Sequence, residues 1–131
     1  MAYEPNMPAA ARRHLEAADI LFEGHRRDVA GYLYGIAAEC AVKAIMSDEG
    51  MRPSGCSKDD PFFAHFPELR TMLRDKQWGR RGVVLRRFIE NDDFLNQWNT
   101  RMRYCKGSDI SQESIQRWRK QAREVVGCIG T

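Results

Sequence analysis

The sequence lacks an apolar stretch long enough to cross a bilayer. Its longest apolar run, residues 36–46, is interrupted by Glu39 and Lys43, whereas a helical span needs about 20 mostly apolar residues. The first eight residues contain no basic cluster followed by an apolar core, so we expect no secretory signal. We therefore predict a cytoplasmic protein with no membrane contact.

Closely spaced cysteine pairs are absent as well. The four cysteines are Cys40, Cys56, Cys105 and Cys128. They are scattered and form no Cys-x-x-Cys pair, which argues against a zinc site and against a small disulfide scaffold. We predict reduced thiols, no metal site and no cofactor.

Neither strand-like alternation nor an internal repeat is visible. The chain has 131 residues, of which 43% are hydrophobic and 30% charged, an ordinary composition for one globular domain. Apolar residues recur every three or four positions, which predicts helices. We predict an all-α protein, an antiparallel (up-and-down) bundle of four to six helices, in a single domain over residues 8–129.

The first two helices are predicted over residues 8–25 and 28–47. Gly24 marks the end of the first, and Asp28 suits the N-cap of the second. Residues 47–61 are rich in Gly, Pro, Ser and Asp and are predicted to form a loop.

Further apolar stripes predict the remaining helices. A short helix is expected over residues 63–73, and another over 84–89. The period continues over residues 94–105, as two short helices or one bent helix. A last stripe covers residues 115–129, preceded by a loose capping box that begins at Asp109.

The net charge of +3 conceals an asymmetry between the two halves of the chain. Residues 1–69 hold seven basic and eleven acidic side chains, whereas residues 70–131 hold fourteen and seven. The basic side chains form two clusters, Arg80, Arg81, Arg86 and Arg87, and Arg117, Arg119, Lys120 and Arg123. Such clusters attract phosphate or an acidic protein surface, or they are solvated helix faces, and both interpretations stay open.

A run of small residues with one acidic and one basic side chain stands in the second predicted helix. Residues 30–44 read AGYLYGIAAECAVKA. Together with later positions it forms an ordered set, Glu39-Cys40, Lys43, His65, Trp98 and Arg103-Tyr104. This set resembles the pattern of the HEPN family over about residues 10–126.

The resemblance implies a helical bundle that pairs as a homodimer. It also implies a role in a toxin–antitoxin, defence or stress system, sometimes beside a nucleotidyltransferase partner protein. We predict a domain that binds a nucleotide, an RNA or a partner protein. The residues expected to bind the ligand are Arg103, Tyr104, Glu39, Lys43, Arg101 and Lys106.

Active relatives of this family carry an Arg that is followed, after four to six residues, by a His. The positions that correspond to the His after Arg103 hold Ser108, Asp109 and Ile110. Asp109 or Lys106 would need strong burial to act near neutral pH, because neither type ordinarily titrates there. We therefore expect a protein that is not an enzyme.

Two alternatives stay open. One is a divergent metal-independent endoribonuclease, in which Arg103 fixes the phosphate and His65 and Glu39 move protons. The other is a structural or regulatory bundle with no ligand.

Each candidate residue also has a structural interpretation. Glu39 either forms an exposed ion pair with Lys43 or reaches across the bundle to Arg103, and we favour the contact with Arg103. His65 more often caps or hydrogen-bonds within a bundle than acts in catalysis. Tyr104 and Trp98 are more often core or interface aromatics than platforms for a base.

Overall fold

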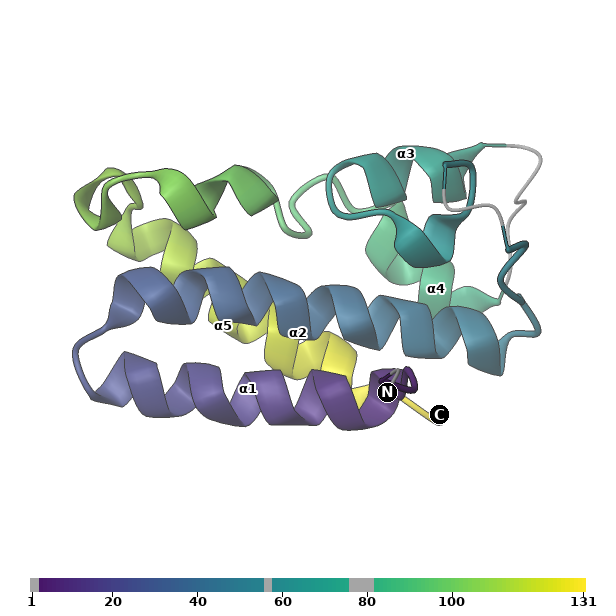
Figure 1. Ribbon diagram of the computed structural model, residues 1–131, viewed down its shortest axis with the longest axis horizontal. Helices are drawn as coiled ribbons and strands as arrows, with labels where there is room; N and C mark the ends of the chain where they lie inside the picture. The colour runs from purple at the N-terminus through teal and green to yellow at the C-terminus, as the bar shows by residue number, and fades with distance from the viewer. Residues whose placement is uncertain (1–2, 56–57, 76–81) are drawn as a thin grey trace.

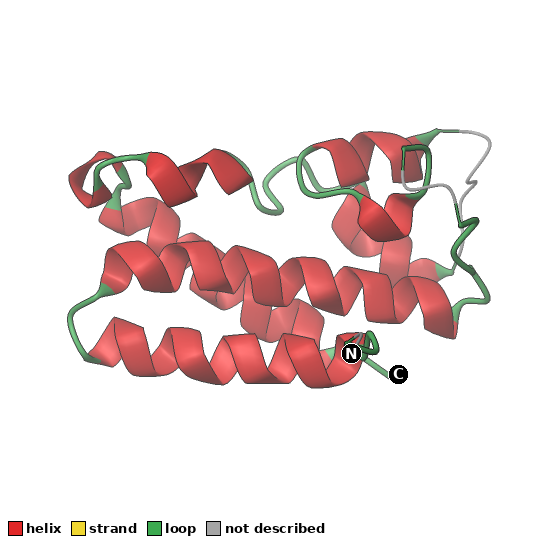
Figure 2. Cartoon of the chain, in the orientation of Figure 1, coloured by secondary structure: helices red, strands yellow, loops and turns green. Residues whose placement is uncertain are grey.

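The computed structural model describes residues 3–55, 58–75 and 82–131, and helices are its only regular structure there (Figures 1 and 2). The α-helices are α1 (Met7–Glu23), α2 (Arg27–Asp48), α3 (Glu68–Arg74), α4 (Val83–Ile89) and α5 (Gln112–Gly127). The 3-10 helices are η1 (Pro61–Phe63), η2 (Thr100–Tyr104) and η3 (Gly107–Asp109). The predicted all-α fold is confirmed.

The helices α1 and α2 form an antiparallel hairpin, and α5 packs behind α2 (Figure 1). Asn6 caps α1 by accepting from the Ala9 N–H at 3.1 Å, and Gly24 ends the helix as predicted. The side of α2 that meets its neighbours is built from fully buried alanines, Ala30, Ala37, Ala38 and Ala41. Small side chains let helix axes approach closely, so α2 becomes the centre of the bundle.

By length and composition α2 is also apolar enough to cross a membrane. However, 72% of its most apolar window is buried inside the bundle, as expected for a core helix. Its apolar character therefore reflects packing against the rest of this chain.

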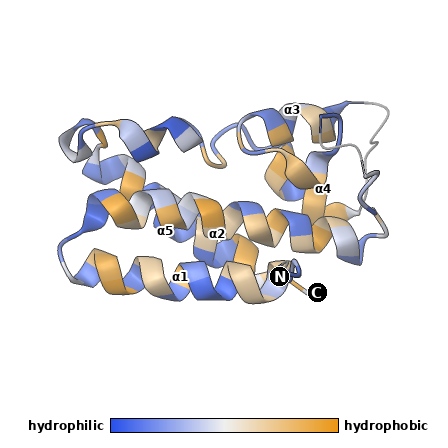
Figure 3. Cartoon of the chain, viewed as in Figure 1, coloured by the Kyte–Doolittle hydropathy of each residue, from blue (hydrophilic) through white to orange (hydrophobic). Residues whose placement is uncertain are grey.

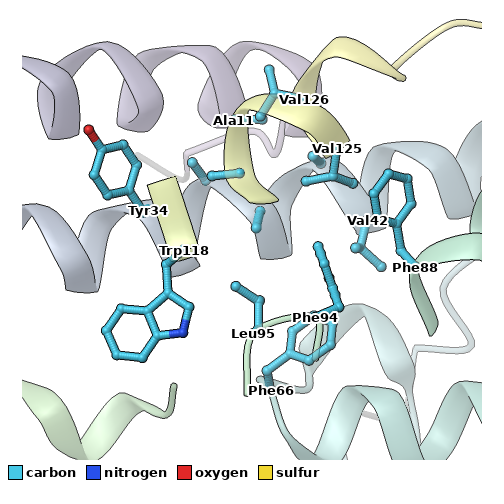
Figure 4. Packing of buried hydrophobic residues seen from close by; sticks show 14 of the residues in the cluster. Ala11, Tyr34, Val42, Phe66, Phe88, Phe94, Leu95, Trp118, Val125 and Val126 are labelled. Atoms are coloured by element: carbon cyan, nitrogen blue, oxygen red, sulfur yellow. The ribbon is translucent and has the colours of Figure 1, made fainter. Parts of the chain in front are cut away.

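The segments between α2 and α5 form a second layer along α2 (Figure 1). At one end, η1, α3 and α4 surround a cluster of aromatic rings, in which Phe94 lies 5.6 Å from Phe66 and 5.2 Å from Phe88 between ring centres (Figure 4). At the other end lie η2 and η3. The two ends are joined by residues 90–99, which contain the buried Leu95 and Trp98.

The predicted helix over residues 94–105 is wrong in its first half, where the chain makes turns instead. Leu95 and Gln97 have φ values of 54° and 69°, in the left-handed region that ends a helix. Gln121 of α5 replaces the missing helical hydrogen bonds, because its side chain accepts from the Leu95 N–H at 2.9 Å and donates to the Asp93 carbonyl at 2.7 Å. The Trp118 indole, also from α5, donates to the Asn96 carbonyl in the same turn.

Three helix starts also differ from the prediction. The N-cap of α2 is Arg26, and Asp28 lies in the first turn, where its charge favours the helix dipole. The cap of α5 is Ser111, whose hydroxyl accepts from the Ser114 N–H at 3.1 Å, so the capping box at Asp109 is not formed. The third helix begins only at Glu68, after Pro67.

The charge asymmetry is largely balanced where α5 meets α1. Arg123 lies 3.2 Å from Asp19, and Arg119 lies 3.7 Å from both Asp19 and Glu23. Two of the four residues of the second basic cluster, Arg119 and Arg123, are therefore ion-paired with α1. In the first cluster Arg87 pairs with Glu124 at 2.6 Å, whereas Arg80 and Arg81 lie outside the described residues.

The described cysteines, Cys40, Cys105 and Cys128, are free thiols, and Cys56 lies outside the described residues. In the described ranges no three His, Cys, Asp or Glu side chains gather closely enough to hold a metal ion.

Candidate functional site

A buried carboxylate stands at the middle of α2. Glu39 accepts a hydrogen bond from the Phe66 N–H at 2.9 Å and contacts His65 Nδ1 at 2.8 Å. Lys43 Nζ lies 3.9 Å from the same carboxylate, and both side chains are buried. The predicted Glu39–Lys43 pair therefore exists, but it is a buried pair and not an exposed one. Glu39 ties the start of α3 to the core helix.

One nitrogen of the His65 imidazole is hydrogen-bonded to Glu39, and the ring is otherwise largely exposed to solvent. An ionised carboxylate can only accept, so Nδ1 carries the proton that His65 donates to Glu39. The His65 side chain is 53% exposed, which leaves Nε2 within reach of solvent or a ligand. This arrangement fixes the tautomer and the orientation of a ring that could exchange a proton.

The predicted contact between Glu39 and Arg103 is wrong. Arg103 Nε donates to the Thr100 carbonyl at 3.1 Å within its own 3-10 turn, and the side chain is exposed. The acceptor oxygens of Glu39 are already occupied by the residues that precede α3. Arg103 lies instead near Tyr32, which precedes Glu39 by seven residues and thus by about 10 Å along the helix axis.

The Arg103 guanidinium lies between two tyrosines. Its central carbon is 5.9 Å from the ring centre of Tyr32 and 5.4 Å from that of Tyr104, which is 81% exposed. These are distances at which a cation is attracted to an aromatic face. Burial raises the pKa of the Tyr32 hydroxyl; the positive charge of Arg103 opposes the rise, and the negative charge of Glu39 adds to it. Tyr32 is therefore close enough to both predicted site residues for their charges to act on it.

Trp98 packs against Tyr32 and holds it in place. Its indole stacks on Tyr32 with ring centres 5.7 Å apart, and its Nε1 donates to the Tyr32 carbonyl at 3.2 Å. Trp98 is buried, which confirms its structural interpretation. Gly35 makes room for it, since a Cβ on Gly35 would lie only 1.9 Å from the indole.

The structure divides the predicted site residues into two groups. Glu39, Lys43 and His65 form one, and Arg103 and Tyr104 form the other, with Arg101 and Lys106 exposed on the same segment. Tyr32 was not among the predicted residues. Its position on α2, four residues before Ile36 and seven before Glu39, places it on the same helix face as Glu39, and this spacing is the signal that could have pointed to it.

A family model of the HEPN domain matches residues 9–130. The chain belongs to the HEPN family. No curated protein and no solved structure has a detectable match to it. The positions at which active HEPN ribonucleases carry their His belong here to η3 and the residue after it, and both Asp109 and Lys106 are exposed. The burial that would adapt either residue to proton transfer is therefore absent from this HEPN domain.

Proposed function

We propose that this HEPN domain binds a nucleotide or RNA through Arg103, Tyr104 and Tyr32, which we call the arginine–tyrosine cluster. The observation that carries the proposal is the state of Arg103: within the described residues its guanidinium contacts no carboxylate, although it is held between two aromatic rings. An unpaired guanidinium suits a phosphate, and an exposed tyrosine suits a stacked base.

The distribution of charge supports the same surface. Arg101 and Lys106 also form no ion pair in the part of the chain that the structure describes, and both are exposed. Arg119 and Arg123, by contrast, are paired with acids of α1. Within the described ranges three unpaired cations, Arg101, Arg103 and Lys106, thus stand on or next to η2, where they would attract a polyanion.

We predict that Arg103→Ala weakens binding of single-stranded RNA by about tenfold at low salt, because one phosphate contact and its cation–aromatic support are lost. Fluorescence anisotropy with labelled RNA over a range of salt concentrations measures both the affinity and its salt slope, which should fall by about one unit. Lys120→Ala, which removes an exposed cation of α5, is the matched control and should bind like the wild type. Equal binding by Arg103→Ala and the wild type would contradict the proposal.

We also propose that two copies pair through the outer face of α2. The residues at this face are Val29, Leu33, Ile36 and Cys40, which follow helical spacing and are all partly or fully accessible. Apolar segments recur along α2 in Figure 3. Burial raises the pKa of the Cys40 thiol, which keeps it neutral and apolar. A helix that is apolar on every side is normally covered on every side.

A second copy suits this face because the two ends of α2 carry opposite charge. Arg26 and Arg27 stand at its N-terminal end, where Arg26 is paired with Asp28 at 3.1 Å and one positive charge remains, and Asp48 and Glu49 stand at its C-terminal end. In a two-fold, antiparallel pair of α2 helices the basic end of one copy would face the acidic end of the other. The helix dipoles would be antiparallel as well.

We predict that Leu33→Glu converts a two-copy assembly into single copies, since it places a charge in the centre of the apolar face. Light scattering after size-exclusion chromatography measures the mass. Val83→Glu on α4 provides the control, because Val83 is equally apolar, 72% exposed and outside this face. A wild-type protein of single-copy mass at high concentration would refute the pairing.

RNA cleavage finds weaker support than binding. Glu39 and His65 form an oriented pair with an open Nε2, which is the geometry of a general base. However, Tyr32, which Arg103 contacts, precedes Glu39 by about 10 Å along the axis of α2, and within the described residues Arg103 forms no hydrogen bond or ion pair with Glu39 or His65. A toxin–antitoxin, defence or stress role and a nucleotidyltransferase partner stay predictions from the family resemblance.

A further inference from the structure

A concave site lies between η2 and the first turns of α5. Its volume is about 480 Å³, within the range of small-molecule sites. The buried residues Trp118 and Ser114 belong to its lining, together with the partly buried Met102 and Ile110. We call this cavity the η2–α5 pocket. Its lining combines an apolar wall with polar or charged side chains at six of its ten residues.

The polar groups of the pocket are only partly satisfied. Gln97 accepts from the Ser114 hydroxyl at 3.4 Å, while its amide nitrogen has no partner within the described residues. Arg101 and Asp109 both line the pocket, yet neither forms an ion pair in that part of the chain. Gln97 also holds the left-handed backbone conformation noted above, which is unfavourable for a residue other than glycine. The Gln97 amide, the Arg101 guanidinium and the Asp109 carboxylate are thus available to bind a ligand in a pocket that also has an apolar wall.

We propose that the η2–α5 pocket receives one unstacked base of a single-stranded RNA. The inference rests on the proposed function, because the same strand would place its phosphates on Arg103 and Lys106. A 3-10 helix has three residues per turn, so Arg101 and Arg103 leave η2 in different directions. Arg101 borders the pocket, and Arg103 lies at Tyr32. A strand that crosses η2 therefore meets a cation on both sides of it.

The chemistry of the pocket favours an unpaired base over other ligands. A base offers a flat apolar face to the apolar lining and polar edges to Gln97 and Asp109. Asp109 can only accept, which suits an amino group of a base or a ribose 2′-hydroxyl. Bases of a duplex are stacked and paired, so a duplex could use the arginine–tyrosine cluster but not the pocket.

Cys105→Trp tests the pocket, because Cys105 lines its mouth, is exposed, and can carry an indole into the cavity without disturbing the core. Binding of a short labelled single-stranded RNA and of a blunt RNA duplex of the same sequence is measured by anisotropy. We expect the single strand to bind about tenfold more weakly to Cys105→Trp than to the wild type, with duplex binding unchanged. Thermal unfolding of the variant confirms that the fold is retained.

A second readout uses the wild-type protein alone. Alkylation of Cys105, followed by mass spectrometry, should slow when the single strand is present and should not slow with the duplex. Unchanged single-strand binding by Cys105→Trp, equal losses for single strand and duplex, or alkylation that ignores the single strand would each overturn the pocket proposal. If Arg103→Ala still weakens binding in that case, the proposed function survives and only the pocket fails. If the wild type binds neither RNA, the proposed function fails first.

Discussion

Replacing Glu39 with alanine is expected to lower the free energy of unfolding by about 3 to 5 kcal/mol. The change leaves three groups without their acceptor: the buried Phe66 N–H, the Nδ1–H of His65, and the buried ammonium of Lys43. An uncompensated buried charge costs more than the pair contributes, which is why the effect is large. Urea denaturation at neutral pH, followed by circular dichroism, measures the loss.

Two further variants separate the causes. Glu39→Gln keeps an acceptor for the Phe66 N–H and should lose less stability than Glu39→Ala. Adding Lys43→Met to Glu39→Ala should recover part of the loss, because it removes the unpaired charge. If Glu39→Ala loses less than about 1 kcal/mol, the carboxylate does not hold the start of α3 as described.

Gly35→Ala is expected to destabilise the protein by about 3 kcal/mol, at the upper end of overpacking effects. The added Cβ would lie 1.9 Å from the Trp98 indole, so the ring must move. Its movement would break the stack on Tyr32 and the hydrogen bond to the Tyr32 carbonyl. RNA binding should weaken in parallel, because Tyr32 supports Arg103. Urea denaturation measures the loss of stability, and fluorescence anisotropy with labelled RNA measures the loss of binding.

The control for this variant is Gly127→Ala, at the end of α5. A Cβ on Gly127 would meet no atom within 4 Å, so the alanine should raise stability by up to about 1 kcal/mol through its helix preference. Gly31→Ala is an intermediate case, since its Cβ would lie 3.0 Å from Ile115. A loss for Gly35→Ala no greater than that for Gly31→Ala would mean that Trp98 has room to move.

The helical hairpin of α1 and α2 was predictable because its information is local. Apolar spacing, a small-residue run and Gly24 all act within a few turns of the chain. The segment between α4 and α5 was not predictable in this way. Its apolar spacing continues a helical period, but Leu95 and Gln97 turn the chain, and Gln121 from α5 satisfies the backbone that the turn exposes.

The candidate site shows the same division. Its residue types were visible in the sequence, and so was the absence of a His after Arg103. The partners were not visible: we weighed Lys43 and Arg103 as partners of Glu39 and favoured Arg103, and spacing along the chain does not indicate a contact with His65. In the structure Glu39 pairs with His65 and Lys43. Arg103 contacts Tyr32 instead, a residue that was not among the predicted site residues.

The sequence by itself determined the helical class, the HEPN family and the chemical groups available to a site, since each of these follows from local periodicity or from an ordered set of residue types. Only the tertiary structure decided which groups meet. That choice depends on the direction in which η2 and the start of α3 approach α2. This direction is set by long-range packing around Trp98 and Phe94 and by the hydrogen bonds that α5 donates and accepts across the bundle.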